Sequence, residues 1–102
     1  MSKVIQARGE ILERSTVLQT EPMGRLRALV DAPEKDELQI ERTPIEITTW
    51  ARAHGKDKIA VVVEARQRRF LGWSQVTADG FYKDSEGTVK PFAEKDYYEH
   101  GY

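Results

Sequence analysis

The stretch from Lys58 to Tyr82 constrains the fold of this chain more than any other segment. It opens with a strict alternation, in which one side carries Ile59, Val61, Val63 and Ala65 and the other carries Ala60, Val62, Glu64 and Arg66. A period of two residues is typical of a β-strand, because successive side chains point to opposite faces of a sheet. We therefore expect a strand over residues 58–69, a bend at Leu71-Gly72 and a returning strand over residues 73–82.

The segments before residue 43 also predict strands. Residues 3–19 alternate at first, and Gly9 is a candidate bulge. A helix is the competing prediction for this segment, because Val4, Arg8, Ile11, Ser15 and Leu18 recur at helical spacing, but Gly9 disfavours it. After a turn at residues 21–24, further strands are expected at 25–31 and 37–42, and a short closing strand is expected at 88–92.

One helix is predicted at about residues 44–54. Thr43-Pro44-Ile45-Glu46 matches a capping box, with Thr43 at the N-cap, Pro44 at the first helical position and Glu46 reaching back. Gly55 follows the segment, where a helix-terminating glycine belongs. An apolar stripe at helical spacing joins Ile47, Trp50, Ala51 and His54.

This order of elements predicts a mostly β fold, with an α+β fold as a possibility. Three strands, a helix and a closing hairpin match a small five- to six-stranded antiparallel OB-like barrel. The alternative is an α+β sandwich with one helix across a curved antiparallel sheet. A chain of 102 residues has room for one core, so we expect a single β-rich domain over residues 1–92. Residues 93–102 form an acidic, aromatic C-terminal tail.

Composition and motifs argue against several classes of function. The chain has no cysteine, which excludes disulfides, thiolate catalysis and cysteine-bound zinc. The N-terminus lacks the apolar core of a signal peptide, so we expect a cytoplasmic protein with no membrane partner. No nucleophile elbow and no glycine-rich phosphate loop occurs. His54 and His100 do not have the spacing of metal ligands, so we expect neither an enzyme nor a metal or other cofactor.

Basic and aromatic residues point to a binding function. Residues 52–73 carry six basic groups against two acids, a local charge of +4 in a chain whose net charge is −1. Guanidinium groups beside flat rings suit a groove that neutralises phosphates and stacks bases. Positive charge on a strand that merely protects a sheet edge is the competing explanation. We therefore predict a non-catalytic module that binds single-stranded nucleic acid through Arg25, Arg27, Arg66, Arg68, Phe70 and Trp73.

A protein-interaction module is the alternative prediction. Tyrosine-rich segments favour interfaces, because the ring buries area while its hydroxyl keeps a polar partner. The tail Asp96-Tyr97-Tyr98-Glu99-His100-Gly101-Tyr102 has this composition. An aromatic surface formed by Trp73 and this tail would bind another protein or a second copy of the chain. The tail could equally dock on its own domain.

A local resemblance supports the first prediction. Residues 53–69, Ala-His-Gly-Lys-Asp-Lys-Ile-Ala-Val-Val-Val-Glu-Ala-Arg-Gln-Arg-Arg, resemble the Gly-Asp-x-Val-x-Val-Glu-Gly-Arg-Leu stretch of bacterial single-stranded-DNA-binding proteins. The match covers about a sixth of the chain. It implies an OB-fold and single-strand binding, with Arg66, Arg68 and Trp73 as the residues carried over. The chain departs from the family in three places: Ala65 replaces a glycine, Trp50 falls in the predicted helix, and the tail ends in His-Gly-Tyr.

Overall fold

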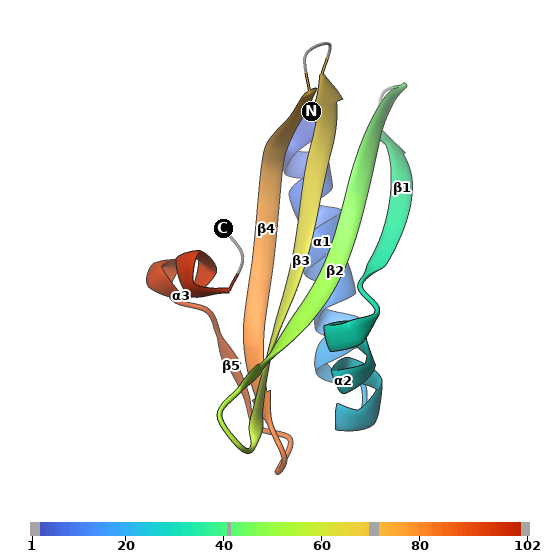
Figure 1. Cartoon of the computed structure of the whole chain (residues 1–102). Helices are drawn as coiled ribbons and strands as arrows, with labels where there is room; N and C mark the ends of the chain where they lie inside the picture. The colour runs from blue at the N-terminus through green and yellow to red at the C-terminus, as the bar shows by residue number, and fades with distance from the viewer. Residues whose placement is uncertain (1–2, 41, 70–71, 101–102) are drawn as a thin grey trace.

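The computed structural model describes residues 3–40, 42–69 and 72–100, with side chains for all of these except 3–5, 68–69, 72–76 and 98. Within these residues, two helices come first and a short third helix comes last, with five strands between them (Figure 1). The elements are α1 (Lys3–Gln19), α2 (Met23–Asp31), β1 (Glu34–Ile40), β2 (Thr43–His54), β3 (Lys58–Arg69), β4 (Gly72–Asp84), β5 (Val89–Pro91) and α3 (Glu94–Glu99).

The strands form one antiparallel sheet in the order β1-β2-β3-β4-β5, so each strand pairs with its neighbour in sequence. The strands therefore form a meander, and the ladder between β3 and β4 shifts its register by one residue between Ala65 and Arg66. An antiparallel five-stranded sheet with helices agrees with the predicted mostly β fold, in the α+β form that the sequence left possible. No ladder between described residues joins β1 to β5, so the closure of a barrel is not confirmed.

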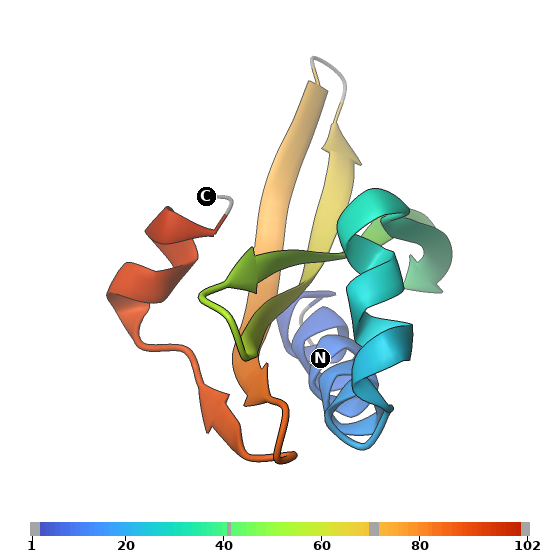
Figure 2. The ribbon, with the colours of Figure 1, turned by 60° about the horizontal axis from the view of Figure 1, so that its bottom comes forward.

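The sheet has a different cover on each of its faces. Helix α1 lies against β4 and β3, and α2 lies against β2, on the face that is turned away in Figure 1. Figure 2 shows the sheet between this helical pair and the C-terminal segment that contains α3. The main core fills the space between the helices and the sheet, and its buried side chains include Ile11, Leu26, Leu29, Ile45, Ile47, Val61, Val63 and Phe81.

The later strands agree with the sequence predictions. The strand expected at residues 58–69 is β3, with the same bounds. The strand expected at 73–82 is β4, which is slightly longer at both ends. Strands β1 and β5 overlap the segments expected at 37–42 and 88–92. The bend predicted at Leu71-Gly72 falls in part outside the described residues.

The strand predicted at residues 3–19 is wrong, because this segment is helix α1. The helical spacing prevailed since it gathers Ala7, Ile11, Ser15 and Leu18 into one buried stripe facing the sheet. Gly9 is exposed, and a Cβ atom added to it would meet no other atom within 4 Å. It therefore costs the helix only its propensity penalty of about 0.5–1 kcal/mol, which the buried stripe outweighs.

The strand predicted at residues 25–31 is also wrong, because it is helix α2. Leu26 and Leu29 are spaced three residues apart and both are buried, whereas Arg25 and Arg27 are exposed. The alternation over so short a segment fitted either period, and contact with β2 selected the helical one.

The predicted helix at 44–54 is wrong as well, because this segment is β2. Ile45, Ile47, Thr49 and Ala51 are buried in alternation, which only an extended chain produces. The segment is rich in β-branched residues, which lose rotamer freedom in a helix and fit a pleated sheet. Gly55 does adopt a left-handed conformation, with φ at 74°, but it does so in the turn between β2 and β3.

Lys83 of β4 connects the sheet to the end of α1. Its side chain is buried, and Nζ donates hydrogen bonds to the carbonyl oxygens of Gln19 and Glu21, both at 2.7 Å. The last carbonyls of a helix lack partners within the helix, and a cation there also complements the helix dipole. Lys83 therefore fixes the turn that leads from α1 into α2.

A close contact fixes the segment after β5. Phe92 donates its backbone N–H to the carbonyl oxygen of Gly80 at 3.0 Å, and its ring covers Gly80. A Cβ atom at residue 80 would lie 2.5 Å from Cδ2 of Phe92. Glycine is therefore required here by close packing and not by an unusual backbone angle.

Among the described residues, no helix combines the length and the apolar composition that are needed to cross a membrane.

We expect Lys83→Met to lower the free energy of unfolding by about 1–3 kcal/mol, because the two carbonyls lose their charged donor while the apolar stem is kept. Urea denaturation measures this change. Lys90→Met is the matched control, because Lys90 is exposed on β5, and we expect a change within about 0.5 kcal/mol. Equal effects of the two substitutions would contradict a capping role for Lys83.

We expect Gly80→Ala to destabilise the protein by about 1–3 kcal/mol, because the new methyl group must displace the Phe92 ring. The same substitution at exposed Gly9 of α1 should instead stabilise it by about 0.4–1 kcal/mol. Urea midpoints of the two variants should therefore move in opposite directions. A neutral Gly80→Ala would show that the Phe92 ring does not rest on this position.

Candidate functional site

The predicted nucleic-acid-binding residues lie on two different parts of the molecule. Arg25 and Arg27 belong to α2, which packs on the helical side of the sheet against β2. Arg25 forms an exposed ion pair with Glu34 at the start of β1, with Nη2 and Oε1 2.6 Å apart, and this pair raises the pKa of Arg25. These two arginines are therefore not neighbours of the basic residues on β3.

Arg66 lies on β3, on the face opposite to α1 and α2. It forms a two-pronged contact with Glu64, in which Nε donates to Oε1 and Nη2 donates to Oε2. The Glu64 side chain is 3% exposed and that of Arg66 is 42% exposed. A buried carboxylate needs such a cation, because its desolvation would otherwise be costly. The positive charge of Arg66 is therefore partly neutralised by Glu64 within the fold.

The register of the β3–β4 hairpin brings two further predicted residues together. Arg68 pairs with Trp73, and Arg66 pairs with Gln75, across the ladder. The positions of Arg66, Arg68 and Trp73 are thus neighbours at one end of the hairpin. Phe70 lies outside the described residues.

A second cluster, which the sequence did not predict, lies at the C-terminal end of β2, away from the end of the β3–β4 hairpin. Trp50, Arg52 and His54 alternate with the core residues of this strand and therefore share its other face. Trp50 donates its indole N–H to the carbonyl oxygen of His100 at 2.9 Å. Arg52 donates to the carbonyl oxygen of Glu99 at 3.0 Å. One face of β2 thus holds the end of α3.

Helix α3 begins with a side chain that satisfies its own backbone. Asp96 accepts a hydrogen bond from the Ala93 N–H at 2.7 Å and another from the Tyr82 hydroxyl at 2.9 Å. These bonds stabilise the carboxylate and lower the pKa of Asp96, with the Ala93 N–H as the largest cause. Burial and the Asp96 bond together raise the pKa of the Tyr82 hydroxyl, which therefore stays a donor.

His100 follows α3 and is only 4% exposed. Its ring lies among those of His54, Tyr82 and Phe92, with ring centroids 5.1, 5.5 and 5.5 Å away. Nε2 of His100 lies 3.1 Å from the Tyr82 hydroxyl oxygen, whereas Nδ1 is buried with no hydrogen-bond partner among the described residues. Burial lowers the pKa of His100, which favours the neutral imidazole.

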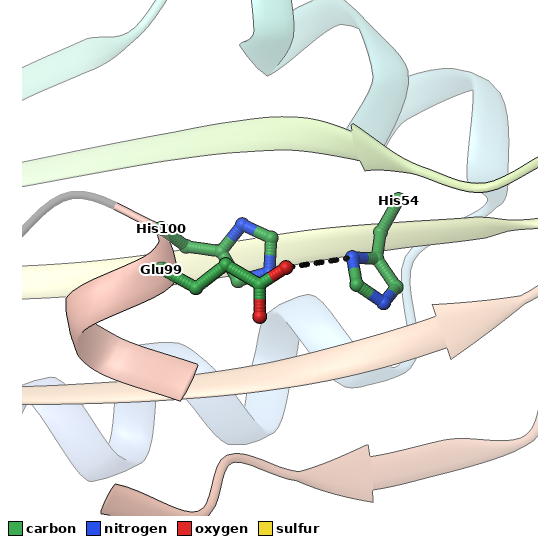
Figure 3. Close-up of side chains that lie close together, drawn as sticks. All are labelled: His54, Glu99 and His100. Atoms are coloured by element: carbon green, nitrogen blue, oxygen red, sulfur yellow. Dashed lines mark ion pairs between the residues drawn. The ribbon is translucent and has the colours of Figure 1, made fainter. Parts of the chain in front are cut away.

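Three potential ligand groups meet at this place (Figure 3). Nδ1 of His54 lies 4.0 Å from Oε1 of Glu99, and one ligand atom from each of His54, Glu99 and His100 lies within 4.8 Å of the others. Two imidazoles and a carboxylate are donors that transition metals and zinc accept. We call these three residues the His-Glu-His cluster.

A pocket of about 660 Å³ opens beside the cluster. His54, Tyr82, Asp96 and Glu99 are among the residues that line it. Three lysines, Lys58, Lys90 and Lys95, also line it. The pocket therefore offers a mixed polar surface, and it is large enough for a small molecule.

The amino-acid sequence contains little signal for this cluster. His54 and His100 are 46 positions apart and neither has a neighbouring ligand at a familiar spacing. The incorrect prediction of a helix at residues 44–54 places His54 at a helix end, and it leaves the C-terminal tail as a separate segment. A correct strand period would have shown Trp50, Arg52 and His54 on one face.

The sequence predicts that the C-terminal tail docks either on its own domain or on another protein, and the position of α3 distinguishes these alternatives. Its residues dock on their own chain, since the Tyr97 ring meets that of Phe92 at 5.2 Å and α3 is bound to β2 and β4.

Comparison with known proteins gives no relative from which a function could be transferred: no family model, no curated protein and no solved structure matches this chain.

Proposed function

We propose that this chain is a non-catalytic binding module whose partner is single-stranded nucleic acid. The binding surface would be the end of the β3–β4 hairpin, around Arg66, Arg68 and Trp73. The observation that carries the proposal is the pairing of Arg68 with Trp73 and of Arg66 with Gln75 across the ladder. This register supports a cation and an aromatic ring acting together on one strand of nucleic acid, where the cation meets phosphate and the ring stacks on a base.

The positions of the three helices also support the proposal. Helices α1 and α2 both cover the far face, and α3 lies beside β4, so among the described residues no helix lies over the near face of the hairpin end in Figure 1. An open antiparallel sheet can serve as a platform on which bases stack, as in four-stranded RNA-binding domains. The proposal therefore does not need the OB-like barrel that the sequence suggested, nor does it need Arg25 and Arg27. Phe70 belongs to the proposal through the sequence alone.

The ion pair with Glu64 decides which arginine tests the proposal best. Removing Arg66 would take a guanidinium from a buried carboxylate, so a loss of binding would be mixed with a loss of stability. Arg68 is the better choice. Arg27 is the matched control, because it is an exposed arginine on α2, away from the hairpin.

We expect a fluorescently labelled single-stranded oligonucleotide to bind with micromolar affinity at about 50 mM salt. Two phosphate contacts on a single strand, from Arg66 and Arg68, would weaken binding about 7-fold between about 50 and 200 mM salt. Fluorescence anisotropy measures both values. Arg68→Ala should weaken binding and reduce the salt slope by about 0.7, and Trp73→Ala should weaken binding with little change in slope.

Arg27→Ala should leave the binding curve unchanged. The proposal is overturned if the wild-type protein does not bind at low salt, or if Arg27→Ala and Arg68→Ala weaken binding equally.

Protein interaction is the second candidate, and one observation favours it. Strand β1 pairs only with β2 within the described chain, and most of its side chains are exposed. An open strand edge can bind an added strand from a second copy or another protein. Its charged residues, among them Glu34, Lys35 and Asp36, oppose this pairing, and for that reason we rank this candidate second.

A homodimer would sediment at twice the mass of 11.7 kDa at micromolar concentration. Because strand pairing relies on backbone hydrogen bonds and not on exposed charges, we expect the dimer to persist when salt is raised. Analytical ultracentrifugation at low and high salt checks this outcome. A monomer at every concentration would argue against self-association and would leave nucleic-acid binding unaffected.

A further inference from the structure

The His-Glu-His cluster is held in place by the strand that supplies one of its members. Strand β2 contributes His54 directly, and its residues two and four positions earlier hold the other two members. Arg52 donates to the carbonyl oxygen of Glu99, and Trp50 donates to that of His100. The strand period of two therefore places three side chains of β2 at the same site: one is a member of the cluster, and two bind the backbone of the other two members. Such anchoring positions the donors before anything binds.

The His100 ring is fixed independently by its neighbours. Tyr82 and Phe92 both contact it, and the Tyr82 hydroxyl lies 3.1 Å from Nε2. Buried polar atoms are nearly always hydrogen-bonded, yet Nδ1 of His100 has no such partner among the described residues. A buried imidazole with an unused nitrogen, beside a second imidazole and a carboxylate, needs an explanation that packing does not give.

We propose that His54, Glu99 and His100 form a binding site for a divalent transition-metal ion, with zinc as the best-fitting ion. Two imidazoles and one carboxylate are the protein ligands of many zinc sites that keep a fourth position open. Magnesium and calcium prefer sites made of oxygen ligands, so this donor set disfavours them. The open position would face the pocket of about 660 Å³, whose lining includes His54 and Glu99.

Only small movements would complete the site. Ligand atoms around tetrahedral zinc lie about 3.3 Å apart, as follows from bonds of about 2.0–2.1 Å. The corresponding atoms here lie within 4.8 Å of one another. The side chains of His54 and Glu99 are 37% and 58% exposed, so both can rotate toward buried His100. Ligation through Nδ1 of His100 would give this nitrogen the partner that it lacks. Ligation through Nε2 would replace its contact with the Tyr82 hydroxyl, which would keep its hydrogen bond to Asp96.

Metal binding would also have a structural effect. An ion bound by His54 on one side and by Glu99 and His100 on the other would cross-link β2 to the end of α3. Because an ion that binds only the folded state stabilises it, zinc should raise the melting temperature of the chain.

Calorimetric titration of Zn²⁺ into the chelator-treated full chain tests the proposal. We expect one equivalent to bind in the micromolar range or tighter, and Mg²⁺ not to bind. His54→Gln and Glu99→Gln should each weaken Zn²⁺ binding about 10-fold or more and should abolish the rise in melting temperature. Both residues are partly exposed, so these variants should still fold. Buried His100 is left intact for the same reason.

Glu94→Gln is the matched control, because Glu94 is an exposed carboxylate at the other end of α3. It should bind Zn²⁺ as the wild-type chain does. Co²⁺ bound at the site should show the strong visible absorption of tetrahedral coordination, which His54→Gln should remove. The proposal is overturned if the wild-type chain binds Zn²⁺ no better than His54→Gln, or if Glu94→Gln weakens binding equally.

Discussion

The period-two alternation of β2 is the constraint on which the rest of the structure depends. On one face, Ile45, Ile47 and Ala51 are buried against the helical layer, and α2 packs on this strand. On the other face, Trp50 and Arg52 hold the carbonyls at the end of α3. In a helix, the core residues and the residues that bind α3 would be distributed around one cylinder. They could not then face the helical layer on one side and the C-terminal segment on the other. The strand therefore both closes the main core and positions the C-terminal segment.

The face of the sheet opposite α1 and α2 is divided between two surfaces with different chemistry. The hairpin end of β3 and β4 carries the Arg66–Glu64 contact, and the positions of Arg68 and Trp73 pair across its ladder. The other end is covered by the C-terminal segment, where the rings of Phe92 and His100 pack on Tyr82 and the Glu99 carboxylate lies near His54. Cations beside an aromatic residue suit a polyanion, whereas two imidazoles and a carboxylate suit a metal ion. The two proposals therefore concern separate parts of one sheet and can be tested separately.

Agreement between sequence and structure follows the type of local pattern. Residues 58–69 predicted the right element because alternating β-branched and small residues fit one period only. Residues 44–54 carried two patterns at once, a capping box and a run of β-branched residues, and the capping signal was misleading. The predicted hairpin correctly implied that Arg66, Arg68 and Trp73 occupy neighbouring positions. Arg25 and Arg27 do not join them, because their segment is helix α2 on the other side of the sheet.

The sequence by itself determined the central hairpin and the antiparallel, β-rich class, because strand alternation and turn glycines act over a few residues. Only the tertiary structure decided whether residues 3–19 and 25–31 form strands or helices, since each segment could present an apolar stripe in either conformation. Both are helices, whose apolar stripes cover the buried face of the sheet. The tertiary structure also decided the meeting of His54 with His100, which are 46 positions apart. They meet because Trp50 and Arg52 of β2 donate hydrogen bonds to the carbonyl oxygens of His100 and Glu99. Contacts of this kind leave no periodic trace in a sequence, because they depend on how two separate elements pack.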